Sequence, residues 1–552
     1  MAILELKVIS SLEKCLHSDK IEDKPEKKEF FMFKNERLSF QIAFFNSEIE
    51  ARVSHFPIKC EGALAKYAKV RRVVNVPVMF PCRFGDDGGA YIKKEAGLYP
   101  DLLQPLHYGN RVSTPYGQLH AVWVDIELPE DFCAGEYGFT FSILSKDKAE
   151  VKGTADVKVT VADALLPEQK LIHTEWFYTD CIAQYYNVKA FSEKHWKYIE
   201  KFMRTATANG INMVLTPVFT PELDTYIGGE RLTTQLVDIT VCENGEYSFD
   251  FTDLHRWIDL ALDCGYKYFE IPHFFTQWGA KHAPKIVARV NGRKKRIFGW
   301  ESDSMGEEYG NFLGKFIPAL LSEFRSRGLD KKCFFHVSDE PHLSDLEQYK
   351  KCKDIIGKYL KGYHIIDALS DYEFYKSGVL QKPVPSTRHI DPFIENKVPG
   401  LWAYYCGSSG TESNRFFTMP TARTRIIGIQ MYLYNIEGFL HWGYNFYNNQ
   451  NSYDVIDPFG YSDGEFFAPS GDMYLVYPGR DGEAMGSIRL NAMREAVDDM
   501  RALSLYEEKF GREAAEKLIY EGVEGKIDFS DYPQGADYLL DLREKIAKAF
   551  VK

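Results

Sequence analysis

The sequence lacks the signals that would place the protein in a membrane or on nucleic acid. No stretch approaches the roughly 20 consecutive apolar residues of a membrane-spanning helix, and charged residues interrupt the N-terminal segment before an apolar signal-peptide core forms. The formal net charge of −12 gives no basic excess for nucleic acid or anionic lipid. We therefore expect a cytoplasmic protein that does not insert into membranes and does not bind nucleic acid.

Metal-site signals are missing as well. The ten cysteines lie far apart, with no CxxC pair and no cluster of Cys and His at zinc spacing. This scatter predicts free thiols and no metal site. Aromatic residues, in contrast, make up 15% of the chain, with 34 Tyr and 8 Trp. That enrichment fits stacking against sugar rings, and it fits a Phe-rich and Tyr-rich core equally well.

The first part of the chain has the hydrophobic period of β-strands. Apolar residues occupy every second position in the ranges 38–44, 122–128 and 137–143, the pattern of strands with one buried face. Turn residues separate these runs, so consecutive antiparallel strands are expected. We predict an N-terminal β-sandwich over residues 1–165.

From residue 166 onward, short apolar strands alternate with segments of helical spacing. The candidate strands are LIHTEWFY, INMVLTPV, YKYFEIPHF, CFFHVSDEP, YHIIDALS, VPSTRHI, LWAYYCG and GFLHWGYNFY. Their number predicts a (β/α)8 TIM-like barrel over 166–486. Residues 487–552 resume a helical pattern, which predicts a C-terminal helical segment packed on the barrel. The expected fold class is therefore multi-domain α/β.

The most informative motif is CFFHVSDEPH, in which an apolar strand runs into Asp339 and Glu340 and stops at Pro341. Barrel enzymes build their active sites at such C-terminal strand ends. Neighbours on an ideal strand point to opposite faces, so both carboxylates reach one pocket only if the backbone leaves the ladder at Ser338. Other pairs of adjacent acids in this chain lie in evident loops or helices. We predict that Asp339 and Glu340 are the catalytic residues.

Adjacent carboxylates suit substrate-assisted hydrolysis of an N-acetylhexosaminide. In ordinary retaining glycosidases, two carboxylates stand about 5 Å apart on separate elements. When the sugar's own 2-acetamido oxygen attacks the anomeric carbon, the protein needs no nucleophile. Asp339 would then orient the acetamido N–H in its ionised form. Glu340 would start protonated as the general acid and later act as the base.

Further residues in or after the candidate strands are expected to bind substrate. They are Asn212, His273, Trp278, Tyr404, Trp442 and Tyr444. We expect a tyrosine hydroxyl to donate a hydrogen bond to the acetamido oxygen, with Tyr444 as the first candidate and Tyr404 as the second. Each of these residues taken alone is more often a buried polar group satisfied within the core.

Three segments occur in a distinctive order: VSDEP, then GDMYLVYPG at 471–479, then SIRLNAMREAVDDMRAL at 487–503. Together they resemble glycoside hydrolase family 123 over nearly the whole chain. The resemblance implies a retaining exo-β-N-acetylgalactosaminidase with its catalytic pair at Asp339 and Glu340. It implies substrates with terminal β-linked N-acetylgalactosamine, such as glycosphingolipid oligosaccharides. It also implies that no metal or organic cofactor is used.

Three rival interpretations stay open. A β-N-acetylglucosaminidase of the same mechanism would differ only in the sugar's 4-hydroxyl orientation, which no residue in the sequence can be shown to read. A non-catalytic carbohydrate-binding protein would explain the aromatic residues but would not need a Glu at a strand end. A metal-dependent hydrolase would use His173, His273, His336 or His441, although no HxH or HExxH pair supports it.

Overall fold

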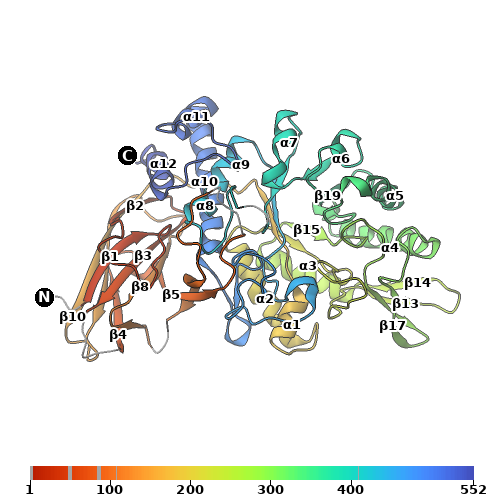
Figure 1. Ribbon diagram of the computed structural model, residues 1–552, viewed down its shortest axis with the longest axis horizontal. Coiled ribbons are helices and arrows are strands. Elements are labelled where there is room, and N and C mark those ends of the chain that lie inside the picture. The colour runs from red at the N-terminus through yellow and green to blue at the C-terminus, as the bar shows by residue number, and fades with distance from the viewer. Residues whose placement is uncertain (1–3, 48–52, 84–88, 107–108, 408–409, 552) are drawn as a thin grey trace.

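The computed structural model describes residues 4–47, 53–83, 89–106, 109–407 and 410–551. It is a mixed α/β protein in which a strand-rich N-terminal region precedes a ring of parallel strands (Figure 1). Within the ranges described, every helix is too short or too polar to cross a membrane.

Two five-stranded sheets form the N-terminal region. The first is antiparallel, in the order β1 (Leu4–Ser10), β3 (Arg37–Asn46), β8 (Leu119–Glu127), β5 (Ala68–Val78), β6 (Gly97–Pro105). The second has the order β2 (Glu29–Met32), β10 (Val151–Val161), β9 (Gly135–Leu144), β4 (Val53–Glu61), β7 (Arg111–Pro115). Side chains from both sheets, such as Phe40 and Phe139, share one buried core. The alternating runs seen in the sequence fall in β3, β8 and β9, so the period-two pattern located these strands correctly.

Eight parallel strands then form a nearly closed barrel. In ring order they are β20 (Lys382–Val384), β19 (His364–Ala368), β18 (Cys333–Phe335), β15 (Tyr268–Ile271), β12 (Met213–Leu215), β11 (Ile172–Glu175), β22 (Gly438–His441) and β21 (Trp402–Tyr404). The two end strands approach each other where the Tyr404 N–H donates to the Pro385 carbonyl, at 3.1 Å. An isolated bridge between Ser386 and Tyr404 adds to this junction.

One stretch of the barrel is less regular than the rest. Seven of the predicted strand segments contain a barrel strand, but VPSTRHI does not, because β20 ends at Val384 and Thr387–His389 form a 3-10 turn. The helices on either side of β20 are only a turn long: α6 (Glu373–Lys376) and α7 (Asp391–Glu395). The short spacing between strands in this part of the sequence leaves no room for longer helices.

Longer helices cover much of the remaining barrel (Figure 1). They are α2 (Glu193–Thr207), α3 (Thr252–Cys264), α4 (Glu307–Ser326) and α5 (Leu346–Gly357), with shorter α1 (Thr179–Tyr185), α8 (Ala422–Arg425) and α9 (Ile427–Leu433). Helix α2 begins where Ser192 Oγ accepts from the His195 N–H, and α3 ends at Gly265, whose φ of 101° is a left-handed cap. Each long helix buries one apolar stripe, as the helical spacing predicts.

A four-stranded sheet inserted into the barrel was not expected. Its order is β14 (Tyr247–Asp250), β13 (Asp238–Val241), β16 (Ile286–Val290), β17 (Arg293–Phe298). In the chain, β13 and β14 follow the barrel strand β12, and β16 and β17 follow the barrel strand β15. The sequence RKKRIF of β17 is charged and mostly exposed, so it lacks the apolar alternation that marks the N-terminal strands.

The C-terminal segment forms three helices: α10 (Ile488–Phe510), α11 (Arg512–Ile519) and α12 (Ala536–Lys548). Ser487 caps α10, because its Oγ accepts from the Leu490 N–H at 3.1 Å. Buried residues of these helices form one core with Leu12 and Phe33 of the N-terminal region and with α9. This segment therefore packs against the N-terminal sheets as well as against the barrel.

Candidate active site

A pocket of about 250 Å³ lies at the C-terminal ends of the barrel strands. Its polar and aromatic wall residues are Arg83, Trp176, Tyr178, Asp224, Gln277, Trp278, Asp339, Glu340, Tyr404, Cys406, Trp442, Phe467 and Asp472. Most of them lie at the end of a barrel strand or in the loop that follows it. Barrel enzymes carry out their chemistry at this end of the fold, so this pocket is the candidate active site.

The backbone turns sharply where Asp339 and Glu340 enter the pocket. Strand β18 ends at Phe335, three residues before Ser338, where the sequence analysis placed the departure from the ladder. Glu340 has a φ of 42°, a left-handed conformation that non-glycine residues rarely adopt, and its N–H donates to the Ala368 carbonyl at 3.0 Å. The alternation of an ideal strand is thereby broken, and the two adjacent carboxylates line one pocket. Backbone strain of this kind gathers at functional sites.

Tyr404 is hydrogen-bonded to one of the two carboxylates. Its hydroxyl donates to Glu340 Oε1 at 2.7 Å. Burial and the nearby charge of Glu340 raise the pKa of Tyr404 well above its usual value, so the phenol keeps its proton and acts as a donor. The contact fixes the position of the Glu340 carboxyl group in the pocket.

Asp339 sits in surroundings that disfavour its charge. Burial raises the pKa of Asp339 well above its usual range, and the neighbouring Glu340 raises it further, while His336 acts in the opposite direction. Compared with an exposed aspartate, Asp339 therefore keeps its proton to higher pH. The ionised state expected of Asp339 therefore needs a compensating contact, such as the hydrogen bond expected from the acetamido N–H of the substrate.

A buried ionic triad lies beneath Asp339. His336 Nε2 is 2.7 Å from Glu270 Oε1, and its Nδ1 is 3.0 Å from Asp367 Oδ1. Burial alone would lower the pKa of His336, but its hydrogen bonds to Asp367 and Glu270 outweigh burial and raise it to about 10. His336 is thus an imidazolium held between two carboxylates.

The same region holds the one cluster of metal-ligand atoms found among the described residues. Ligand atoms of His273, His336 and Asp367 lie within 4.8 Å of one another. Both nitrogens of His336 are already hydrogen-bonded to carboxylates, so a metal ion would have to replace a proton in one of these contacts. The geometry fits the ionic triad better than a metal site.

Three of the predicted substrate-binding residues line the pocket: Trp278, Tyr404 and Trp442. Trp278 is 44% exposed, which is unusual for so large an apolar ring in a folded protein. The backbone N–H of Trp278 donates to the carbonyl of Asp339 at 3.1 Å, so the backbone at Trp278 is held next to the Asp339–Glu340 segment. An exposed indole at the pocket is available to stack against a sugar ring.

The other three predicted substrate-binding residues do not line the pocket. Asn212 lies just before β12, at the opposite end of the barrel, where its side chain bonds to the backbone of Leu171 and His173. The Tyr444 hydroxyl donates to the Phe202 carbonyl at 2.8 Å, so this residue belongs to the core.

His273 is the third of these residues. It packs against the rings of His336, at 4.3 Å between centroids, and Trp176, at 5.5 Å. It lies beside the pocket residue Trp176 and does not itself line the pocket. In all three cases the sequence showed a polar residue near a strand but not the direction of its side chain.

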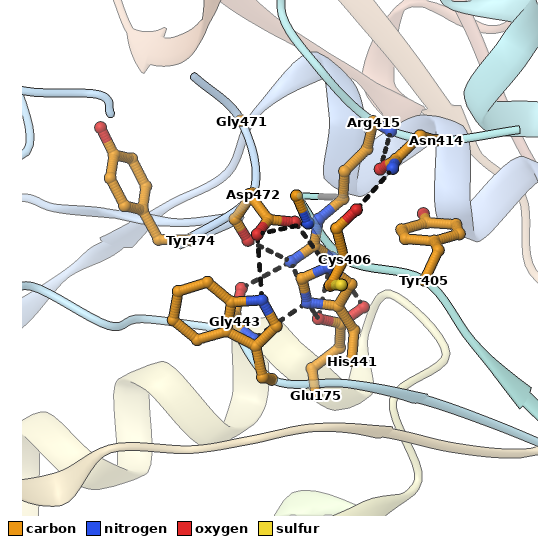
Figure 2. Close-up of polar contacts among 12 residues, drawn as sticks. Glu175, Tyr405, Cys406, Asn414, Arg415, His441, Gly443, Gly471, Asp472 and Tyr474 are labelled. Carbon is orange, nitrogen blue, oxygen red and sulfur yellow. Dashed lines mark hydrogen bonds and ion pairs between the residues drawn. The ribbon is translucent and has the colours of Figure 1, made fainter. Parts of the chain in front are cut away.

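A buried charge network supports the pocket wall beside β22 (Figure 2). Arg415 Nη1 donates to both carboxylate oxygens of Glu175, at 2.9 and 2.8 Å, and its Nη2 donates to His441 Nδ1 at 2.6 Å. Because Nδ1 accepts, the proton of the neutral His441 ring lies on Nε2, which donates to Asp472 Oδ1 at 3.2 Å. Burial and the charge of Arg415 lower the pKa of His441, in keeping with a neutral ring.

Asp472 connects this network to the pocket (Figure 2). Its Oδ2 accepts from the indole N–H of Trp442 at 3.0 Å and from the Gly407 N–H at 2.9 Å. At the other end of the network, burial would raise the pKa of Glu175, but Arg415, His173 and His441 together outweigh burial and hold that pKa at about 2. Asp472 therefore orients the indole ring of Trp442 in the pocket and is itself held by the buried charge network.

A second ionic contact ties the same loop to the N-terminal region. Arg489 of α10 pairs with Asp101 of β6 at 2.8 and 2.9 Å, and it donates to the carbonyls of Gly471 and Tyr474 at 2.6 Å. Gly471 and Tyr474 lie on either side of Asp472 in the chain. The N-terminal sheet thus helps to hold the pocket loop, so it contributes to the site without supplying Asp339 or Glu340.

Several pocket residues were missed in the sequence analysis. Asp472 lies within GDMYLVYPG, one of the segments that carry the family resemblance, so a signal for it existed. Tyr178, Asp224 and Gln277 lie in loops without a recognisable motif. Burial raises the pKa of Asp224 to about 6, although the Asn451 N–H opposes the shift. Perturbed carboxyl groups in a pocket are candidates for a functional role.

Replacing Asp472 by Asn should weaken substrate binding. An amide offers one acceptor oxygen where the carboxylate offers two, so the contact to His441 or the contact to Trp442 and Gly407 is lost. We expect KM to rise about 10-fold through misplacement of Trp442, and stability to fall by about 1–3 kcal/mol. Steady-state kinetics and thermal unfolding measure both effects. The exposed Asp263→Asn is the matched control, and an unchanged KM in Asp472→Asn would rule out this positioning role.

Adjacent carboxyl groups and indole rings at the C-terminal end of a barrel of parallel strands fit acid–base chemistry on a sugar. The model of the glycoside hydrolase 123 catalytic domain matches residues 176–506. That match spans more than half of the chain and includes the catalytic candidates and the Asp472 loop. The chain belongs to glycoside hydrolase family 123.

One solved structure agrees with this assignment at the level of the fold. A family 123 glycoside hydrolase from Clostridium perfringens, described in terms of glycolipid glycan hydrolysis, superimposes with a TM-score of 0.73 at 16% identity. The alignment covers 99% of this chain and 97% of that one. A Bacteroides ovatus GH5 xyloglucanase gives 0.30 at 8% identity, covering 90% of this chain and 100% of its own. A search of curated proteins found no match.

Proposed function

We propose that this enzyme is a retaining exo-β-N-acetylgalactosaminidase that uses the substrate's 2-acetamido group as nucleophile. The observation that carries the proposal is the placement of two adjacent carboxyl groups, Asp339 and Glu340, in one pocket. Two carboxylates acting across a sugar ring come from separate elements about 5 Å apart. A neighbouring pair suits a reaction in which one carboxylate orients an attacking group and the other moves protons.

In the first step, the acetamido oxygen attacks the anomeric carbon and the glycosidic C–O bond breaks. Glu340 transfers its proton to the departing oxygen, and Asp339 accepts the acetamido N–H and stabilises the positive charge that develops on the ring being formed. In the second step, water attacks the anomeric carbon, the bond from that carbon to the acetamido oxygen breaks, and the water gives a proton to Glu340. This restores the acid and yields a sugar of retained configuration. Tyr404, bound to Glu340 Oε1, holds that carboxyl group in line.

The raised pKa of Asp339 fits this cycle when the pair is treated as sharing one proton. Before substrate binds, burial favours that proton on Asp339. The acetamido N–H then supplies a hydrogen bond that stabilises ionised Asp339, and the proton moves to Glu340, where the leaving group needs it. Substrate binding thereby sets the protonation states for catalysis.

The proposal extends to the natural substrate and to the organisation of the chain. Glycosphingolipid oligosaccharides with terminal β-linked N-acetylgalactosamine are the proposed substrates, supported by the glycolipid glycans named for the Clostridium perfringens enzyme. We place a β-sandwich at 1–165, a TIM-type barrel at 166–486 and a helical unit at 487–552. The enzyme is proposed to act in the cytoplasm without a metal or organic cofactor.

Hydrolysis of 4-nitrophenyl β-glycosides of N-acetylgalactosamine, N-acetylglucosamine and galactose tests the proposal. We expect turnover of the first, with the β-anomer as the initial product by proton NMR, and inhibition by the thiazoline derived from N-acetylgalactosamine. Preference for the N-acetylglucosaminide would keep the mechanism and change the sugar. Efficient cleavage of the plain galactoside would show that the acetamido group is dispensable and would refute the substrate-assisted mechanism.

A further inference from the structure

Three polar side chains in the pocket have no part in the reaction described above: Tyr178, Asp224 and Gln277. They follow β11, β12 and β15, which are neighbours in the barrel, whereas Asp339 and Glu340 follow β18. The three side chains therefore occupy one arc of the pocket wall, next to the catalytic pair.

Two of these side chains carry buried polar atoms without a partner. Among the described residues, neither the Tyr178 hydroxyl nor the Gln277 side-chain nitrogen has a hydrogen-bond partner. Tyr178 is 2% exposed and Gln277 is 7% exposed. A buried polar group left unpaired costs about 1–3 kcal/mol, so two such groups in one pocket wall point to a ligand that supplies the missing partners.

Asp224 is held in a strained conformation by contacts on both sides. Its φ is 45°, in the left-handed region. Its N–H donates to Gln277 Oε1 at 2.7 Å, the Asn451 N–H donates to its Oδ2 at 2.9 Å, and Ser452 Oγ–H donates to its carbonyl at 2.7 Å. Because Gln277 Oε1 is already an acceptor, the amide NH2 group is the part of Gln277 left to donate. The carboxylate of Asp224 and the amide NH2 group of Gln277 thus place a hydrogen-bond acceptor next to a donor.

Arg231 stiffens the base of this arc. Its Nε donates to Asp180 Oδ2 at 2.7 Å and its Nη1 donates to the Leu223 carbonyl at 2.9 Å. The guanidinium lies 5.0 Å from the centre of the Tyr178 ring, within the range of a cation–π contact. The residue before Asp224 and the ring of Tyr178 are therefore fixed by one buried arginine.

We propose that Asp224 and Gln277 bind the 4-hydroxyl of the sugar, that Tyr178 binds the neighbouring 6-hydroxyl, and that Asp224 determines which 4-epimer is cleaved. This inference rests on the proposed function, which places C1 and C2 of the ring at Glu340 and Asp339. A hydroxyl group donates one hydrogen bond and accepts another, so a carboxylate beside an amide NH2 group matches it. A site built for a hydroxyl discriminates strongly, because its polar groups are left unpaired when the hydroxyl is missing or turned away.

The test compares 4-nitrophenyl β-N-acetylgalactosaminide with its 4-deoxy analogue in wild type, Asp224→Asn and Asp263→Asn. Asp224→Asn should lower kcat/KM about 30-fold for the hydroxylated sugar and less than about 3-fold for the deoxy sugar. Asp263→Asn, at an exposed position, should leave both values unchanged. Equal losses in Asp224→Asn on both sugars would overturn the assignment.

Tyr178→Phe provides a second test that does not depend on the strained loop. The Tyr178 hydroxyl has no partner among the described residues, so its removal should leave Tm unchanged or higher while lowering kcat/KM about 10-fold for the 6-hydroxylated sugar only. If wild type cleaves no N-acetylhexosaminide, the proposed function fails. Equilibrium binding of N-acetylgalactosamine and its 4-deoxy analogue to wild type and Asp224→Asn then decides the inference, and equal affinities would reject it.

Discussion

Replacing Glu340 by Gln should lower kcat/KM for an N-acetylgalactosaminide with a poor leaving group by about 1,000-fold, because general acid catalysis typically contributes 10²–10⁴-fold. The amide keeps the shape of the side chain and still accepts a hydrogen bond from Tyr404, but it has no proton to give to the departing oxygen. The backbone at residue 340, with its φ of 42°, is unaffected by this side-chain change. Steady-state kinetics with an alkyl glycoside measure the loss.

Leaving-group chemistry separates loss of the acid from loss of the fold. A 2,4-dinitrophenyl glycoside needs no protonation, so its first step should slow only about 10-fold in Glu340→Gln, and added azide should restore turnover by attacking the intermediate without a base. Glu373→Gln, at a half-exposed position on α6, is the matched control. Full activity of Glu340→Gln on the alkyl glycoside would remove Glu340 from the mechanism.

The sequence alone predicted that Asp339 and Glu340 lie at a strand end, because the apolar strand and the two acids are adjacent in the chain. It also located most barrel strands and long helices, since each buries a stripe with a period that can be counted. The inserted sheet of β13, β14, β16 and β17 was missed because its strands are short and partly exposed. Hydrophobic periodicity therefore predicted the elements with long apolar stripes and missed short strands that bury at most two residues each.

Side-chain direction was harder to infer than position. Tyr404 is the last residue of β21, and Tyr444 lies just after the end of β22. The Tyr404 hydroxyl nevertheless contacts Glu340, whereas the Tyr444 hydroxyl contacts the backbone of α2. The network behind the pocket joins Arg415 to Glu175, which lie 240 residues apart in the chain. No local pattern reports a contact of that range, because it depends on how β11 and the loop after β21 meet in space.

Replacing Asp339 by Asn should reduce activity and raise stability together. The variant keeps an acceptor oxygen for the acetamido N–H but cannot balance the positive charge that develops on the intermediate, so kcat should fall about 100-fold or more. Burial and the neighbouring Glu340 hold the pKa of Asp339 above its usual value in the folded protein. Because the folded state binds this proton more tightly than the unfolded chain, the stabilising contribution is complete below about pH 4 and is lost as pH rises through the folded pKa.

The neutral amide of Asp339→Asn removes this pH dependence of stability. The difference in Tm between the variant and wild type is therefore expected to grow with pH. Asp339→Asn should match wild type in Tm below about pH 4 and exceed it by about 1–3 °C near neutral pH. Thermal unfolding from acid to neutral pH measures this, with the exposed Asp263→Asn as the control that should follow wild type throughout. A variant less stable than wild type at neutral pH would mean that the Asp339 charge is compensated, and the shared-proton description of the pair would have to be given up. A gain in Tm with kcat lost would mark Asp339 as a carboxylate kept for catalysis at a cost in stability.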